Sequence, residues 1–168
     1  MQTTSPTLAR RPGPAGFTLV ELLVVVAILG IVSAVAFIPG SADSAEADLD
    51  LAEIEVRDAF ATAQTLAYSL GEPVGVVFDP ATERFAVVKK DGQTAPDPLT
   101  HGAYEIDFRH IVQPHNVRIE SASFGTTKTA GILDAEGVPV SGGSVVLSKG
   151  NATRTLVLDA ATGLLTAQ

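Results

Sequence analysis

The stretch FTLVELLVVVAILGIVSAVAFI, residues 17–38, is mostly apolar and carries one charged residue, Glu21. Residues 1–16, MQTTSPTLARRPGPAG, precede it, and Pro39-Gly40 follows it. At about 1.5 Å per residue, a helix of this length spans the roughly 30 Å hydrocarbon core of a bilayer. We therefore predict a transmembrane helix over 17–38 that kinks or ends at Pro39-Gly40, because proline lacks an amide hydrogen.

Two other interpretations of the apolar stretch fit less well. A buried helix of a soluble protein would need apolar neighbours on every face, which a chain of 168 residues can hardly supply. The apolar region of an ordinary secretory signal peptide is shorter, about 7–15 residues. Arg10 and Arg11 precede the stretch, and the next basic residue is Arg57. The positive-inside rule therefore predicts that the N-terminus is cytoplasmic and that the C-terminal domain lies on the other side of the membrane.

Glu21 is the residue that a simple membrane anchor does not explain. A carboxylate at the centre of a membrane helix costs about 2.5–3.5 kcal/mol, and such residues usually have a partner or a function. Glu21 lies only four residues from the start of the stretch, so its side chain can also reach the membrane interface. Position alone leaves both explanations open.

The motif Gly16-Phe17-Thr18-Leu19-Val20-Glu21, with a basic leader before it and an apolar helix after it, resembles the type IV prepilin signal. This signal is found in type IV pilins and in the pseudopilins of type II secretion. The resemblance implies that a prepilin peptidase cleaves between Gly16 and Phe17 and that the new amino group of Phe17 is methylated. It also implies that Glu21 assists filament assembly by facing the N-terminal amine of a neighbouring subunit. The expected location is the bacterial inner membrane, with a periplasmic C-terminal domain.

The residues after the apolar stretch predict a second helix, from Ser41 to Gly71. Asp43-Ser44-Ala45-Glu46 resembles a capping box at its start, and Gly71 is a typical C-terminal stop. Leu51 and Ile54 fall outside the apolar stripe and are expected to touch a neighbouring subunit. The stripe that should pack on a sheet consists of Leu49, Ala52, Val56, Ala59, Phe60, Ala63, Ala67 and Leu70.

Beyond Gly71 the apolar residues alternate, which is typical of strands. The predicted strands are 74–78, 84–89, 104–108, 116–123, 138–140, 144–148, 154–159 and 164–166, with turns at 79–83 and 160–163. One long helix followed by strands predicts an α+β, pilin-like fold in which the helix packs against an antiparallel β-sheet. The predicted organisation is a leader at 1–16, a membrane and filament-core helix at 17–38, and an exported domain at 39–168.

This order of elements is similar to that of the H-type minor pseudopilins and the related FimT-type minor pilins, the GspH/FimT family. The features that carry this second resemblance are Gly137 before the paired runs 144–148 and 154–159, and Thr162-Gly163-Leu164 near the end of the chain.

Residues with the chemistry of catalysis or metal binding are few. The chain has no cysteine, and its three histidines, His101, His110 and His115, lack the spacing of a zinc site. Neither a nucleophile elbow nor a phosphate-binding glycine loop occurs. We therefore expect no enzyme activity, no cofactor and no metal.

Two functions follow from the resemblances. The first is a structural role as a minor pseudopilin of the type II secretion pseudopilus, with prepilin peptidase, other pseudopilins and the inner membrane as partners. The second is a FimT-like minor pilin involved in pilus assembly or DNA uptake. Without the leader the chain has nine basic and nineteen acidic residues, a net charge of −10. This acidity favours the secretion role and argues against a nucleic-acid partner.

Overall fold

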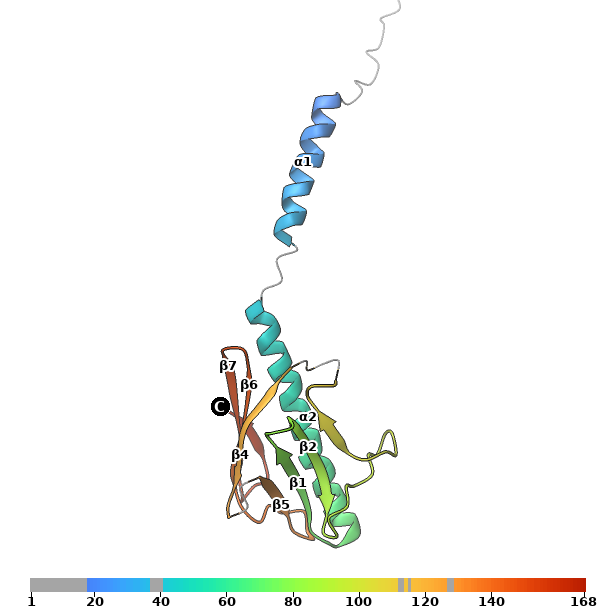
Figure 1. Ribbon diagram of the computed structural model, residues 1–168, viewed down its shortest axis with the longest axis vertical. Helices are drawn as coiled ribbons and strands as arrows, with labels where there is room; N and C mark the ends of the chain where they lie inside the picture. The colour runs from blue at the N-terminus through green and yellow to red at the C-terminus, as the bar shows by residue number, and fades with distance from the viewer. Residues whose placement is uncertain (1–17, 37–40, 112–113, 115, 127–128) are drawn as a thin grey trace, which may run out of the picture. The chain divides into compact units, whose positions relative to one another are not determined.

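A computed structural model gives the fold of most of the chain (Figure 1). It divides the chain into two units, Met1–Pro39 and Gly40–Gln168. The predicted kink at Pro39-Gly40 lies outside the described residues, and so does the leader. The described residues are 18–36, 41–111, 114, 116–126 and 129–168, without the side chains of 31–36 and 41–44.

The described part of the first unit is the helix α1 (Leu19–Ala36). Thr18 caps it: the Glu21 amide donates a hydrogen bond to Thr18 Oγ1 at 3.2 Å. This bond satisfies an amide that the first helical turn leaves without a backbone partner. The large apolar side chains between Leu19 and Leu29 are all exposed. Among the described residues, no helix is both long enough and apolar enough to cross a membrane, so the span at 17–38 stays a prediction.

The long helix of the second unit, α2 (Ser41–Leu70), confirms the predicted second helix. Seven of the eight residues of the predicted apolar stripe are buried, and the exception is Leu70, which is 49% exposed at the end of the helix. The helix already begins at Ser41, so the capping box predicted at Asp43 does not mark its start. Leu51 and Ile54 are exposed, as expected of residues outside the stripe.

The strands of the described residues form two antiparallel sheets of four strands each, whereas the sequence predicted one sheet. The first sheet has the order β3-β2-β1-β5, with β1 at Val74–Asp79, β2 at Arg84–Lys89, β3 at Glu105–Asp107 and β5 at Ala130–Leu133. The second has the order β4-β6-β7-β8, with β4 at Arg118–Phe124, β6 at Gly143–Lys149, β7 at Ala152–Leu158 and β8 at Leu165–Ala167.

Two of the differences between predicted and observed strands have local causes. The strand predicted at 138–140 is reduced to a single bridge between Leu133 and Pro139, because proline cannot donate to a strand ladder. The strand predicted from Asn116 begins only at Arg118, since Asn116 has a φ of 53°. Strand β5 was not predicted from the sequence; it pairs with β1 of the first sheet and not with its chain neighbour β4.

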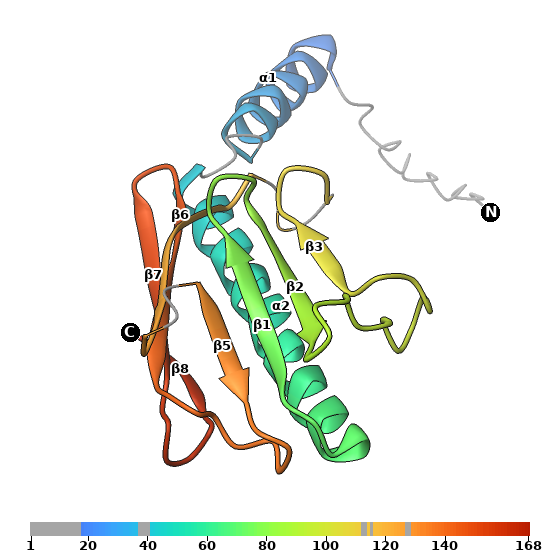
Figure 2. The ribbon, with the colours of Figure 1, turned by 60° about the horizontal axis from the view of Figure 1, so that its bottom comes forward.

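Helix α2 packs against both sheets and closes a single core (Figure 2). Five buried phenylalanines line this core in a continuous chain, with ring centroids 5.5 to 6.3 Å apart. Aromatic rings at such distances contribute beyond the apolar area that they bury. They come from α2, from three strands and from the residue after β3: Phe60, Phe78, Phe85, Phe124 and Phe108.

Glu83 joins the two sheets through its side chain. It lies in the turn between β1 and β2 with a φ of 55°, an uncommon conformation for a residue with a side chain. Its Oε2 accepts a hydrogen bond from the Ile119 amide of β4 at 2.6 Å. Its Oε1 lies 3.4 Å from Arg118 Nε, and its carbonyl accepts the Phe108 amide at 3.1 Å.

We expect Glu83→Ala to lower the free energy of unfolding by about 2 kcal/mol, because it leaves the part-buried Ile119 amide without an acceptor. Urea unfolding of the full chain in detergent measures this change. Glu83→Gln keeps an acceptor and should cost less. Glu105→Ala, which removes an exposed carboxylate, is the control. Equal urea midpoints for Glu83→Ala and Glu105→Ala would contradict the bridging role.

Aspartates initiate the turns of this domain. In each turn the carboxylate accepts a hydrogen bond from the amide two residues later, which closes the turn locally. Hydrogen bonds lower the pKa of Asp97 and Asp159, mainly through the Leu99 amide at Asp97 and through the Thr162 amide, three residues later, at Asp159. The bonded pairs are Asp79 with Ala81, Asp91 with Gln93, Asp97 with Leu99, Asp107 with Arg109, Asp134 with Glu136 and Asp159 with Ala161.

These turns predict an acid-sensitive fold. Where the pKa is lower in the folded than in the unfolded chain, the ionised group stabilises the fold above the unfolded pKa of about 3.9. That stability is lost as the pH falls through the folded-state pKa values. The urea concentration at the midpoint of unfolding should therefore decrease once the pH drops below about 4. Asp159→Asn keeps an acceptor but cannot ionise, so its urea midpoint should decrease less steeply with falling pH than that of Glu136→Gln. Parallel pH profiles of the two variants would contradict this account.

Candidate functional site

Glu21 occupies the first turn of α1, three residues after the capping residue Thr18. The capping hydrogen bond uses the Glu21 amide, so its carboxylate is not needed to start the helix. The side chain is exposed, and every other described side chain from Leu19 to Leu29 is apolar. A positive group that met this carboxylate among such neighbours would be attracted strongly, because little water would screen the pair.

The predicted cleavage and methylation site, Gly16 and Phe17, lies outside the described residues. Cleavage after Gly16, methylation of Phe17 and the assembly role of Glu21 stay predictions from the sequence. The described structure adds that the helix starts only two residues after Phe17, at Leu19.

The histidines do not come together. His110 Nδ1 lies 2.8 Å from Asp107 Oδ2 on the surface, His101 lies in an exposed loop, and His115 is outside the described residues. Within the described part of the chain, no group of three or more histidine, cysteine, aspartate or glutamate side chains is placed to hold a metal ion.

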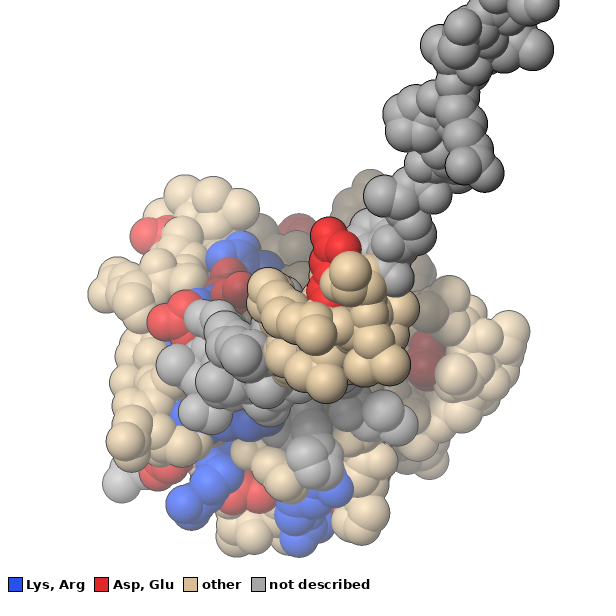
Figure 3. All heavy atoms as spheres, turned by 90° about the horizontal axis from the view of Figure 1, so that it is seen from above, with Lys and Arg blue, Asp and Glu red and all other residues tan. Residues whose placement is uncertain are grey.

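Basic side chains of the second unit are already matched with acids. Among its described lysines and arginines, each except Lys90 forms an ion pair with a carboxylate of the same unit. Figure 3 shows one face of the molecule, on which lysine and arginine side chains lie next to aspartate and glutamate side chains. The pairs are Arg57–Glu53, Arg84 with Glu105 and Asp107, Lys89–Asp91, Arg109–Asp107, Arg118–Glu83, Lys149–Asp48 and Arg154 with Asp50 and Glu53.

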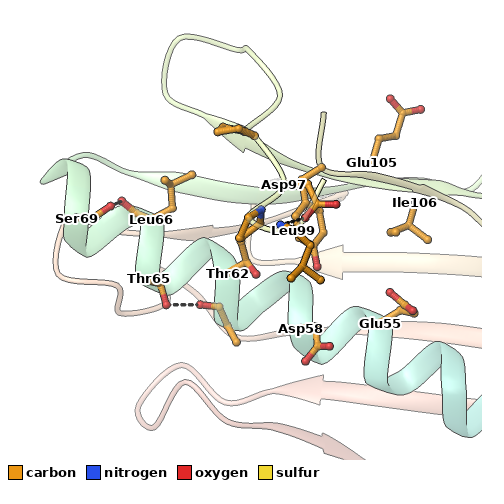
Figure 4. Close-up of a pocket in the computed structure, with 14 residues that line it drawn as sticks. Glu55, Asp58, Thr62, Thr65, Leu66, Ser69, Asp97, Leu99, Glu105 and Ile106 are labelled. Carbon is orange, nitrogen blue, oxygen red and sulfur yellow. Dashed lines mark hydrogen bonds between the residues drawn. The ribbon is translucent and has the colours of Figure 1, made fainter. Parts of the chain in front are cut away.

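The second unit also has a groove of about 530 Å³ between α2 and the connection from β2 to β3. Figure 4 shows Glu55 and Asp58 on α2, with Asp97 and Leu99 of the connection across from the helix. Its apolar walls are formed by Ala61, Leu66, Pro96, Pro98, Leu99, Tyr104 and Ile106, and its polar residues are Glu55, Asp58, Thr62, Thr65, Ser69, Asp97 and Glu105.

Burial and, to a smaller extent, nearby negative charge raise the pKa of two side chains in the groove. Burial raises the pKa of Glu55, and the nearby carboxylate of Asp58 raises it further. Burial also raises the pKa of Tyr104, and the carboxylates of Glu55, Asp58 and Asp97 add to that effect. Among the described lining residues there is no lysine or arginine to offset this charge.

The connection from β2 to β3 is held in place at its base. The Ala95 amide donates to the Val87 carbonyl at 2.7 Å, and the Tyr104 amide donates to the Ala95 carbonyl at 2.8 Å. Asp97 fixes the tip by accepting the Leu99 amide at 2.8 Å. The groove was not predicted from the sequence. The available signal was Leu99, the one large aliphatic residue between Lys90 and Tyr104.

Comparison with known proteins concerns the N-terminal segment. Residues 11–37 match the family model of the prokaryotic N-terminal methylation motif, a range that includes Gly16, Phe17 and Glu21. No curated protein and no solved structure matches the chain. The match supports a type IV pilin-like prepilin signal, and thus a type IV pilin-like or pseudopilin protein. Such a signal implies processing by a prepilin peptidase, a membrane-anchored N-terminus and assembly with other pilin-like subunits.

Proposed function

We propose that this protein is a minor pseudopilin, a structural subunit of the type II secretion pseudopilus that supports protein export across the outer membrane. The match of residues 11–37 to the methylation motif is the observation that carries this proposal. The long helix α2 on antiparallel sheets is consistent with it. In this proposal α1 anchors the subunit in the inner membrane until assembly, the second unit is periplasmic, and the role is structural and not catalytic.

The charge distribution supports secretion over the FimT-like alternative of DNA uptake. Binding to DNA relies on lysines and arginines that are free to neutralise phosphates. Here the described basic side chains of the second unit, apart from Lys90, are in ion pairs. Phosphates would have to compete with these carboxylates in a chain that carries an excess of acids. We therefore propose the pseudopilin role first and keep the pilus role as the alternative.

Deleting the gene in its native host tests this choice. We expect exported enzymes to accumulate in the periplasm, because the pseudopilus lacks a subunit, and the frequency of natural transformation to stay unchanged. Enzyme assays on medium and periplasm measure the first quantity, and colony counts after DNA addition measure the second. The intact gene, returned on a plasmid, is the control. Normal secretion with lost transformation would overturn the proposal and favour the FimT-like role.

A further inference from the structure

The groove beside α2 combines apolar walls with an exposed apolar side chain at its rim. Leu99 is 90% exposed at the tip of the β2–β3 connection, although the hydrogen bonds of Ala95 and Asp97 hold this connection in place. An apolar side chain held out on an ordered loop can bury area against a partner with little further loss of conformational freedom. Across the groove, Leu66 and Ile106 add apolar surface to the walls.

The acidic residues of α2 differ in whether a basic side chain forms an ion pair with them. Asp48, Asp50 and Glu53, which face the β6–β7 hairpin, are paired with Lys149 or Arg154. By contrast, Glu55 and Asp58 face the groove, and the described residues provide no basic partner for either of them. Like charges three residues apart on a helix repel each other. A positive group in the groove would relieve this repulsion.

This charge pattern selects among possible occupants. A metal ion is disfavoured because the described acids of the groove do not converge into a metal-binding group. A second copy of this chain is disfavoured because its described lysines and arginines in 41–168, apart from Lys90, are occupied by its own carboxylates. The occupant that fits is a peptide segment of a different protein, with a lysine or arginine next to apolar side chains.

We propose that this groove docks a segment of another pilin-like filament subunit, one that carries lysine or arginine flanked by apolar residues. The basic group lies between Glu55 and Asp58, and the apolar side chains lie against Leu66, Leu99 and Ile106. This inference rests on the proposed function, since it takes the partner from the same filament. The groove thereby sets which subunit lies beside this one.

Site-specific photocrosslinking in the native host tests the inference. The full chain is made with p-benzoylphenylalanine in place of Leu99, irradiated, purified and analysed by mass spectrometry. We expect a crosslinked peptide of another pilin-like subunit with a lysine or arginine within a few residues of the link. The double variant Glu55→Gln/Asp58→Asn should lower the crosslink yield about tenfold, as loss of a charge-assisted contact does.

A matched control separates groove charge from total charge. Glu72→Gln/Glu136→Gln removes the same two charges from exposed sites outside the groove and should leave the yield unchanged. Circular dichroism of both double variants checks that they fold. The inference is overturned by an absent crosslink, by a crosslink to a second copy or to a protein outside the filament, or by a linked segment without a basic residue. It is also overturned if EDTA abolishes the crosslink, or if the yield is the same in both double variants.

The secretion assay of the deletion strain judges the proposed function separately. An absent crosslink in a host whose secretion requires this protein overturns the groove inference alone. A crosslink to a pilin-like subunit in a host that secretes normally without this protein overturns the secretion role and leaves the docking groove in place.

Discussion

Glu21→Ala is expected to reduce incorporation of this protein into filaments by at least about tenfold, while cleavage after Gly16 and membrane insertion continue. The reason is electrostatic: a carboxylate and an amine buried together in an apolar bundle attract strongly, and removing one leaves the other buried without a partner. The variant also makes the helix more apolar, so insertion into the membrane should not suffer.

This variant tests the role of the Glu21 carboxylate without disturbing the start of the helix. The hydrogen bond that caps α1 runs from the Glu21 amide to Thr18 Oγ1, and alanine keeps that amide. Alanine is also the residue with the highest helix propensity. A loss of incorporation would therefore report on the carboxylate and not on a damaged helix start.

Crosslinking to neighbouring subunits in intact cells measures incorporation, and intact mass measures processing. Both chains should begin with methylated Phe17. Glu21→Gln should behave like Glu21→Ala, whereas Glu72→Ala, which removes an exposed acid of the second unit, should assemble normally. Normal assembly of Glu21→Ala would contradict the pairing role. An unprocessed N-terminus on the native chain, or cleavage after Ala36, would contradict the prepilin signal itself.

Gly143→Ala is expected to destabilise the second unit by about 3 kcal/mol, the upper part of the usual range for overpacking. Gly143 begins β6 opposite Phe124 of β4. A Cβ atom at this position would lie 2.3 Å from the Ser123 carbonyl oxygen and 2.7 Å from the Phe124 Cα atom. These are backbone atoms of a paired strand, so relief would require the two strands to separate. Phe124 also belongs to the aromatic core, so the disturbance should spread into it.

Urea unfolding followed by circular dichroism measures this change, and Gly102→Ala is the matched control. A Cβ atom at Gly102 would have its closest contact with Thr100 Oγ1, at 3.5 Å, which is ordinary van der Waals contact. Gly102→Ala should therefore stay within about 0.5 kcal/mol of the native chain. Equal stability of the two variants would show that β4 and β6 can move apart without cost.

Local periodicity was enough to predict α2 and its buried face. Residues from Leu49 to Ala67 repeat with the helical period, and every member of the predicted stripe in this range is buried. Leu70 continues the same pattern but is exposed in the last turn of the helix. Periodicity gives the face of a helix, whereas burial also requires that another element lies against that face.

The arrangement of the strands depended on pairing between distant residues. The short strand β5 is defined by its pairing with β1, more than fifty residues earlier in the chain. The ion pairs Lys149–Asp48 and Arg154–Asp50 likewise join residues more than a hundred positions apart. A short apolar run does not specify its neighbour, because any strand with a free edge offers the same backbone hydrogen bonds.

By itself, the sequence determined the prepilin-type segment and the long amphipathic helix, because both depend only on residues that are close together in the chain. Gly16, Phe17 and Glu21 are adjacent in a motif, and the buried face of α2 follows from its period. Only the tertiary structure decided that the strands form two sheets and that a groove opens beside α2. Both depend on which distant segments meet. Among the described residues, no basic side chain pairs with Glu55 or Asp58 in the groove, whereas Lys149 and Arg154 pair with other acids of α2.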